Sequence, residues 1–246
     1  MRDAPLPLGV TIGPLGSASD AIAEVAAMGL AAVQLDASDA SMRPREMGSS
    51  ARRDLAASLR RLGLRASGID CFVPVERFAD AAQVERAVQA VNGSIALAEA
   101  LDRAPVCLHL PADQTVAAEL RREAERRGVA LADFTLPVLQ GTAQVGVDPA
   151  ALLAAGSDPV AHVAGMAGRV AAARVVDLLQ GGMRGPIEQP GASRLDAMAY
   201  RLALEMAGFR GLPVIDCRQW VDARRAARAC AERWVALLPA VEGSGA

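Results

Sequence analysis

Short apolar runs alternate with amphipathic helical patterns along most of the chain. The runs are apolar at nearly consecutive positions, as in LGVTIG near the start and VCLHL near the middle. Such runs are typical of strands buried on both faces of a parallel sheet, and the patterns between them are typical of covering helices. The predicted strands are Leu8–Gly13, Ala32–Asp36, Ala66–Asp70, Val106–Leu110, Val129–Asp133, Val145–Asp148, Ala173–Leu178 and Val214–Cys217.

Glycine, an apolar strand and aspartate follow one another in the same order at several places in the chain. A helix ends in glycine, an apolar strand follows and an aspartate closes the strand at Gly29–Asp36, Gly63–Asp70 and Gly208–Asp216. Eight strand–helix pairs predict an α/β fold, a single (β/α)8 TIM barrel. The alternative is a doubly wound open sheet, but GPLGSASD after the first strand lacks the GxGxxG spacing of its phosphate loop.

The composition is that of a folded globular chain, with 246 residues, 52% hydrophobic and 22% charged. No Pro/Ser-rich linker divides it, so we expect one barrel domain over residues 1–240 and a flexible tail over 241–246. No apolar run reaches the roughly 18–20 residues of a membrane helix. The formal net charge of −2 gives no basic excess that would favour nucleic acid. We therefore expect a cytoplasmic protein that binds neither membranes nor nucleic acid.

Two residue types that many enzymes need are scarce. All 26 basic residues are arginine, so the chain holds no lysine amine for a Schiff-base aldolase, a pyridoxal-phosphate enzyme or a Walker-type P-loop ATPase. The two histidines, His109 and His162, cannot build a three-histidine zinc site. The four cysteines form no CxxC pair, and we expect them to be reduced and mostly buried.

Aspartates follow six of the predicted strands, at the end of the barrel where active sites of this fold lie. Converging carboxylates repel one another, so they must bind a cation, pair with arginine or take up protons. Each also has a structural interpretation, because aspartate after a strand often caps the next helix or stabilises a turn. The six are Asp36, Asp70, Asp133, Asp148, Asp177 and Asp216.

His109 lies near the end of the fourth predicted strand, before Pro111 and Asp113. A histidine on an apolar strand is often a hydrogen-bonded core residue. Its place at the strand end favours a general base or a substrate-binding donor at neutral pH. His162 lies within a helical pattern and is interpreted as structural.

Several stretches together carry a resemblance to a known family. They are LGVTIG, GLAAVQLDAS, CLHLPAD, VGVDPAALLAAGSDPVAHVAGMAGRVAAARVVDL and the closing GFRGLPVIDCRQW. With them, nearly the whole chain resembles the xylose-isomerase-like TIM barrels, which are sugar isomerases and epimerases with endonuclease IV as a relative. Members of this family bind a divalent metal through Glu, Asp, His and Glu at the ends of strands five to eight, and two of the acids transfer protons next to a carbonyl.

The resemblance places these ligand positions on the present sequence, which departs from the pattern at most of them. The first glutamate falls at Asp133 or its neighbour Ala132, the aspartate at Asp148 and the last glutamate at Asp216. The histidine falls at Arg174, whose cation is unfavourable beside a divalent metal and could replace its charge. We therefore expect either no cofactor or a weakly bound divalent metal (Mn, Mg, Zn or Co) held by the three aspartates. The endonuclease IV relatives are less favoured still, because their metal cluster is histidine-rich and this chain is not.

The resemblance implies an isomerase or epimerase of a sugar, or of a sugar-like polyol or keto acid, acting by proton transfer next to a carbonyl. Asp133 and Asp216 would be the acid/base partners, and His109 would orient the substrate. The candidate substrate-binding residues are Asp36, Asp70, Arg174, Asp177 and Arg218.

Two other function classes stay open. One is a barrel that has lost turnover and binds a small molecule or a protein partner. The other is a metal-independent lyase or hydrolase, in which Arg174 or Arg218 would hold a carboxylate or phosphate in a bidentate manner. The expected partners are a small-molecule substrate and a second copy of the chain in a homodimer, since relatives often pair.

The arginine at the metal-histidine position generates one further expectation. A charged arginine in a partly buried rim must be paired or it destabilises the fold. We therefore expect the Arg174 guanidinium to lie within hydrogen-bonding reach of Asp148, Asp177 or Asp216.

Overall fold

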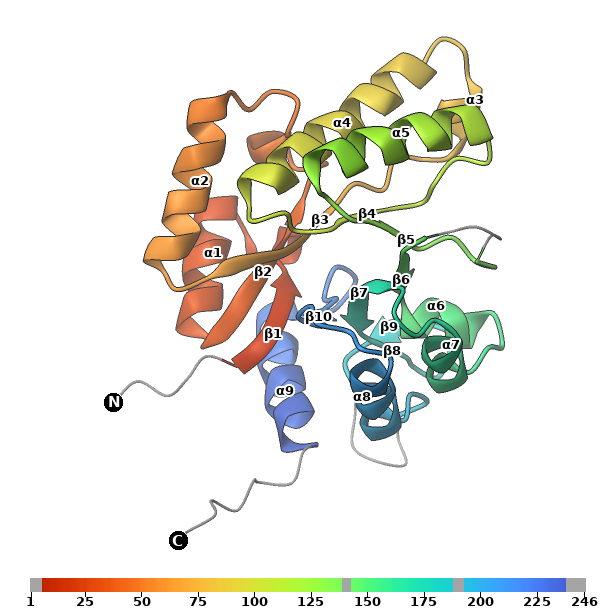
Figure 1. Cartoon of the computed structure of the whole chain (residues 1–246). Helices are drawn as coiled ribbons and strands as arrows, with labels where there is room; N and C mark the ends of the chain where they lie inside the picture. The colour runs from red at the N-terminus through yellow and green to blue at the C-terminus, as the bar shows by residue number, and fades with distance from the viewer. Residues whose placement is uncertain (1–5, 139–142, 188–192, 238–246) are drawn as a thin grey trace, which may run out of the picture.

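Eight parallel strands close into a barrel in the computed structural model, which describes residues 6–138, 143–187 and 193–237. The strand order around the barrel is β1-β10-β7-β6-β5-β4-β3-β2, and β1 closes it by pairing in parallel with both β2 and β10 (Figure 1). The strands are β1 Leu6–Thr11, β2 Leu30–Asp36, β3 Arg65–Asp70, β4 Val106–Leu108, β5 Leu131–Asp133, β6 Val145–Val147, β7 Val170–Val175 and β10 Val214–Ile215. The single (β/α)8 barrel expected from the sequence is confirmed.

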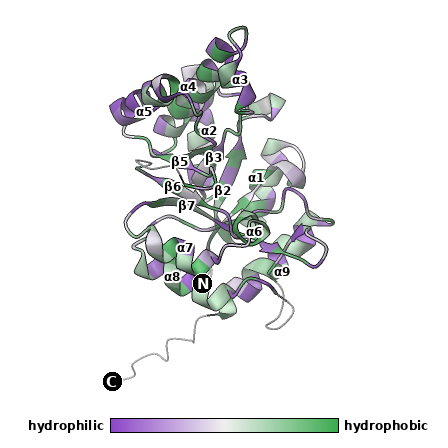
Figure 2. Ribbon diagram, turned by 90° about the vertical axis from the view of Figure 1, so that its right-hand side faces the viewer, coloured by the Kyte–Doolittle hydropathy of each residue, from purple (hydrophilic) through white to green (hydrophobic). Residues whose placement is uncertain are grey.

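Helices surround the barrel, and Figure 2 shows hydrophilic residues along outer helices such as α5. The helices are α1 Ala18–Ala27, α2 Ser49–Arg61, α3 Glu76–Ala79, α4 Val84–Ala100, α5 Gln114–Arg127, α6 Pro149–Ala154, α7 Pro159–Gly165, α8 Ala197–Met206 and α9 Ala223–Ala236, with short 3-10 helices at Gly13–Leu15 and Ala40–Met42. No helix within the described ranges is long and apolar enough to cross a membrane. The expected tail over 241–246 lies outside the described residues.

The recurrent glycines between helix and strand have a common backbone conformation. Gly29, Gly63 and Gly208 adopt φ of 74°, 72° and 76°, a left-handed conformation that only glycine reaches without strain. This turn ends each helix and returns the chain to the amino end of the next strand. The aspartate after that strand consequently lies at the opposite end of the barrel, and all six strand-end aspartates gather at that end.

The seventh predicted strand, Ala173–Leu178, is only partly correct. The barrel strand β7 ends at Val175, and the residues after Val176 leave the barrel as a small antiparallel hairpin, β8 Asp177–Leu178 with β9 Arg184–Gly185. Asp177 pairs there with Gly185 and not with a neighbouring barrel strand. The hairpin lies between β7 and α8 in the sequence. It places Arg184 against Asp148 and Asp216, at the end of the barrel where the strand-end aspartates lie.

Polar side chains occupy part of the barrel interior, and glycines make room for them. The Ser67 hydroxyl donates to Gln34 Oε1 at 3.1 Å, and Gln34 Nε2 donates to Asp70 Oδ1 at 2.8 Å. A Cβ at Gly9 would lie 2.7 Å from Ser67 Oγ, and one at Gly68 would lie 2.8 Å from Gln34 Oε1. These two glycines therefore give space to a buried hydrogen-bond chain on β2 and β3.

Gly146 on β6 has the same role for an aromatic ring. A Cβ at this position would overlap the ring carbons of Phe134, the residue that follows β5. The Phe134 ring packs with the buried side chains of Cys107, Ala132 and Ala172. The small residue on β6 thus allows an aromatic ring to fill the adjacent interior.

We expect Gly146→Ala to lower the free energy of unfolding by about 1–3 kcal/mol, because the Phe134 ring must move to relieve the overlap. Urea denaturation measures this loss. Gly165→Ala in α7 is the matched control, since an added Cβ there meets no atom within 4 Å. Equal stability of the two variants would contradict the prediction.

Candidate active site at the barrel mouth

Arg174 is a charged residue closed inside the barrel. It lies on β7, its side chain is 1% exposed, and its Nη2 donates to Oδ1 of Asp70 at the end of β3. In the closed order of eight strands, β7 and β3 are opposite one another, so the side chain spans the lumen. Its guanidinium also lies 5.3 Å from the centre of the Phe134 ring, within cation–π range.

The prediction of the partner of Arg174 was wrong. The predictions that the Arg174 side chain points inward and that it pairs with a carboxylate were correct. The guanidinium binds Asp70 instead of Asp148, Asp177 or Asp216. The long side chain reaches across the lumen. The three carboxylates on its own side are engaged elsewhere, two by other arginines and one by backbone amides.

Arg218, two residues after Asp216, holds that carboxylate through two hydrogen bonds. Its Nε lies 2.7 Å from Oδ1 and its Nη2 lies 2.5 Å from Oδ2. The remaining terminal nitrogen lies 3.4 Å from Oδ2 of Asp70. Arg218 therefore links the acid after β10 to the acid that Arg174 binds.

Arg184 on the β8–β9 hairpin provides the third cation. It binds Asp148 in a bidentate manner at 3.1 and 2.8 Å, and its Nη2 also lies 2.9 Å from Asp216 Oδ2. Arg184 was not predicted as a site residue, because GGMRGP has neither strand nor helix periodicity. The paired glycines did signal a turn, and an arginine on a loop after the seventh strand was the available clue.

These six residues form one network, which we call the mouth cluster. Three guanidinium groups and three carboxylates alternate in it, so its formal charges cancel. Burial alone would raise the pKa of the Asp216 carboxyl, but the hydrogen bond from Arg218 and the charges of Arg174, Arg218 and Arg184 hold it well below its ordinary value. The members are Asp70, Asp148, Arg174, Arg184, Asp216 and Arg218.

The other three strand-end aspartates bind local groups. Asp36 accepts hydrogen bonds from the backbone N–H and hydroxyl of Ser38 at 2.8 and 2.6 Å. Asp133 accepts the backbone N–H groups of Leu110 and Thr135 at 3.2 and 3.0 Å. The structure thus brings Asp70, Asp148 and Asp216 together around arginines and leaves Asp36 and Asp133 outside that network.

Asp177 is fully buried and binds both ends of the segment between β7 and α8. Its carboxylate accepts the backbone N–H groups of Leu178, Arg194 and Leu195 at 2.8, 3.0 and 2.9 Å, and also the hydroxyl of Ser193. All four donors belong to the segment that begins at β8 and leads into α8. Asp177 thus holds the start and the return of this excursion at one point.

His109 lies at the mouth beside an aromatic residue that the sequence analysis did not single out. Its ring centre is 5.1 Å from that of Phe72, which follows β3, and the Arg218 guanidinium is 5.4 Å from the same ring. Burial lowers the pKa of His109 below its ordinary value, against the opposing charges of Asp133 and Asp148. The imidazole is therefore neutral at pH 7. His162 lies in the last turn of α7.

At the positions that the resemblance assigns to metal ligands, the structure places side chains that already have other partners. Asp148 and Asp216 already bind Arg184 and Arg218, Asp133 accepts two backbone amides, and the cation of Arg174 stands at the histidine position. Among the described residues, no three or more His, Cys, Asp or Glu side chains gather in a way that could hold a metal ion. Arginine charge compensates the carboxylates here.

Solved structures with similar folds include sugar-processing proteins. A xylose isomerase domain protein from Planctomyces limnophilus has a TM-score of 0.68 and 18% identity over 95% of this chain and 97% of its own. D-Psicose 3-epimerase with D-tagatose from Clostridium cellulolyticum H10 gives 0.70 and 14%, over 94% and 99%. The IolI protein with a zinc atom gives 0.69 and 15%, over 94% and 95%. The chain has the fold of these xylose isomerase-like barrels. No protein-family model and no curated protein matches the sequence.

We expect Arg174→Met to lower the free energy of unfolding by about 3 kcal/mol, because it leaves the Asp70 carboxylate buried without its main cation. The double variant Asp70→Asn/Arg174→Met should recover more than half of this loss, since no unpaired charge remains. Urea denaturation provides both values, with the exposed Arg60→Met on α2 as the surface control. A double variant that is less stable than Arg174→Met would contradict the ion-pair interpretation.

We also expect the purified protein to retain clearly less than one equivalent of Mn, Zn, Mg, Co or Fe after mild dialysis. The physical reason is that the candidate carboxylates are already bound by arginine. Elemental analysis measures the metal content. A full equivalent of one metal that survives treatment with a chelator would refute this expectation.

Proposed function

We propose that the barrel mouth catalyses proton transfer next to the carbonyl of a small polyhydroxy ketone or keto acid, as an isomerase or epimerase does. One observation carries this proposal: His109 and the Arg218 guanidinium contact the same Phe72 ring. A neutral imidazole and a permanent cation are therefore available to one small molecule. The epimerases among the structures of similar fold support the same reaction type.

The two groups have complementary tasks in such a reaction. The imidazole of His109 accepts the proton from the carbon next to the carbonyl, and the bonding electrons shift to the carbonyl oxygen. The guanidinium groups of Arg184 and Arg218 stabilise the resulting enolate oxygen. Return of the proton from the imidazolium to the neighbouring carbon, which carried the carbonyl, with transfer of the hydroxyl proton of the original carbon to the enolate oxygen, gives an isomer. Protonation of the original carbon by water from the opposite face gives an epimer, and the imidazolium then releases its proton to solvent.

The exposed fractions of the side chains support the roles proposed for the two arginines. The side chains of Arg184 and Arg218 are 20% and 31% exposed, whereas that of Asp216 is 1% exposed and fully engaged by them. In this proposal Asp216 positions the two arginines and does not exchange protons. The negative charges of Asp133 and Asp148 stabilise the imidazolium of His109 when it carries the proton.

We expect His109→Gln to slow exchange of the hydrogen next to a carbonyl by about a hundredfold or more, because the acid/base group is lost. A panel of ketoses and keto acids in D2O, followed by NMR, measures this exchange whatever the final product. His162→Gln removes the other histidine and serves as the control, with no expected change. Absence of exchange in the whole panel, or equal rates in the His109 variant, would overturn the proposal.

The pH dependence gives a separate expectation. Proton abstraction needs neutral His109, so kcat/KM should rise with pH and become constant above the pKa of this residue. Since burial lowers that pKa, the inflection should lie below 6.5. A pH–rate profile of the native enzyme measures the inflection. The profile of His162→Gln should keep it, and an inflection above 6.5 would argue against His109 as the base.

A further inference from the structure

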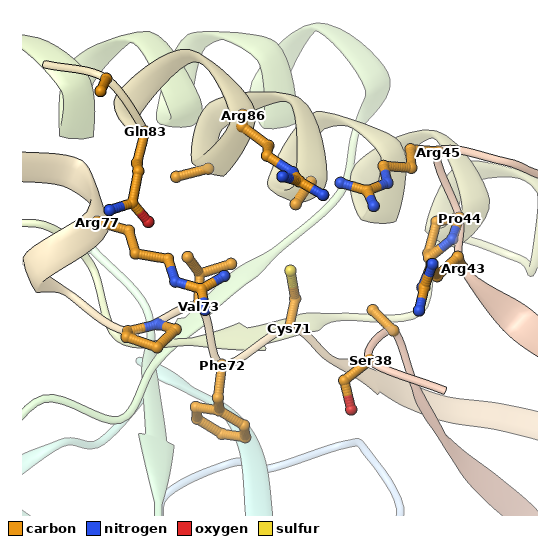
Figure 3. Close-up of a pocket in the computed structure, with 15 residues that line it drawn as sticks. Ser38, Arg43, Pro44, Arg45, Cys71, Phe72, Val73, Arg77, Gln83 and Arg86 are labelled. Atoms are coloured by element: carbon orange, nitrogen blue, oxygen red, sulfur yellow. The ribbon is translucent and has the colours of Figure 1, made fainter. Parts of the chain in front are cut away.

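A cavity of about 680 Å³ lies beside the barrel mouth, between the loops after β2 and β3 and helix α4. Four arginines line it, Arg43, Arg45, Arg77 and Arg86, and no aspartate or glutamate does. Figure 3 shows the guanidinium groups of Arg45, Arg77 and Arg86 directed into the space above Cys71. The cavity is therefore strongly basic in a chain whose overall charge is slightly negative.

Few protein carboxylates compensate these arginines. Arg43 and Arg45 share one, that of Glu46, at 3.2 and 3.5 Å. Among the described residues, neither Arg77 nor Arg86 forms an ion pair. The arginines at the end of α5 differ, because Arg126 and Arg127 both bind Glu123. Like charges that gather without counter-charges favour the binding of an anion.

The cavity wall is held in place before any ligand binds. Arg52 on α2 donates to the carbonyl oxygen of Pro44 at 2.9 Å and so fixes the loop that carries Arg43 and Arg45. The same loop packs closely on α4, where a Cβ at Gly93 would lie 3.0 Å from the Arg45 backbone nitrogen. Arginines from the loop and from the helices thus face a common space. Binding of an anion there would lose little backbone entropy, because the loop is already held against α2 and α4.

Phe72 lies between the cavity and the mouth. It lines the cavity, and its ring also contacts His109 and the Arg218 guanidinium. A ligand anchored in the cavity would have to pass this ring to reach His109 and Arg218, which do not line the cavity themselves. Guanidinium forks match the oxygens of phosphate in geometry and charge, and several of them suit a dianion.

We propose that this cavity binds the phosphate group of a phosphorylated small molecule whose carbonyl end lies at the barrel mouth. The assignment of that end rests on the proposed function, whereas phosphate binding rests on the cavity alone. A substrate of this class is a ketose phosphate, with the phosphate held by Arg77 and Arg86 and the carbonyl beside His109.

Isothermal titration of the full chain at fixed ionic strength tests the proposal, with fructose 6-phosphate, fructose and inorganic phosphate as probes. We expect fructose 6-phosphate to bind at least about tenfold more tightly than fructose, with inorganic phosphate as a competitor. Arg77→Gln/Arg86→Gln should abolish this preference. Arg60→Gln/Arg122→Gln removes the same charge from exposed positions on α2 and α5 and should retain it.

The outcomes separate the two proposals. Equal binding of fructose and fructose 6-phosphate, or an unchanged preference in the cavity variant, overturns the phosphate site whether or not the enzyme turns over. If that preference depends on Arg77 and Arg86 while no probe undergoes hydrogen exchange, the phosphate site stands and the proposed function fails.

Discussion

A permanent guanidinium charge inside a closed barrel is the constraint on which the rest of the site depends. Water cannot solvate it there, so the opposite wall must supply an anion, and Asp70 does so from β3. Asp70 is in turn fixed by Gln34, which is held by Ser67, and glycines on β1 and β3 leave space for both. One charge on β7 thus determines residue choice on three strands across the lumen.

The same choice of cation concentrates proton chemistry on one residue. Arginine does not release its proton in proteins, and the arginines around Asp216 hold the pKa of that carboxyl well below its ordinary value. The three guanidinium groups of the mouth cluster are therefore permanent charges. His109 is the group near it whose charge changes close to neutral pH. A fixed electrostatic frame around one titrating imidazole is suited to a reaction in which a proton leaves and returns.

The fold was predictable because each repeat carries its own signals. A glycine turn, an apolar strand and a following aspartate are local features, and they locate the barrel and its functional end. The sequence also identified Arg174 as an inward cation. It could not identify Asp70 as the partner, because that contact depends on which strands are opposite in the closed barrel. Arg184 and Phe72 were missed for a related reason, since one lies on a two-residue strand outside the barrel and the other on a loop, and both acquire a role only through neighbours distant in sequence.

The hydrogen bonds that Asp177 accepts from Leu178, Arg194 and Leu195 have a consequence for how this site can change in evolution. One buried carboxylate anchors both the departure of the hairpin segment and its return at Arg194 and Leu195. Insertions or deletions in the turn between β8 and β9 lie outside the barrel strands and outside the hydrogen bonds of Asp177. They would, however, shift Arg184, which the segment carries over the mouth. Substrate preference can therefore diversify by changes in loop length alone, at little cost to the stability of the barrel.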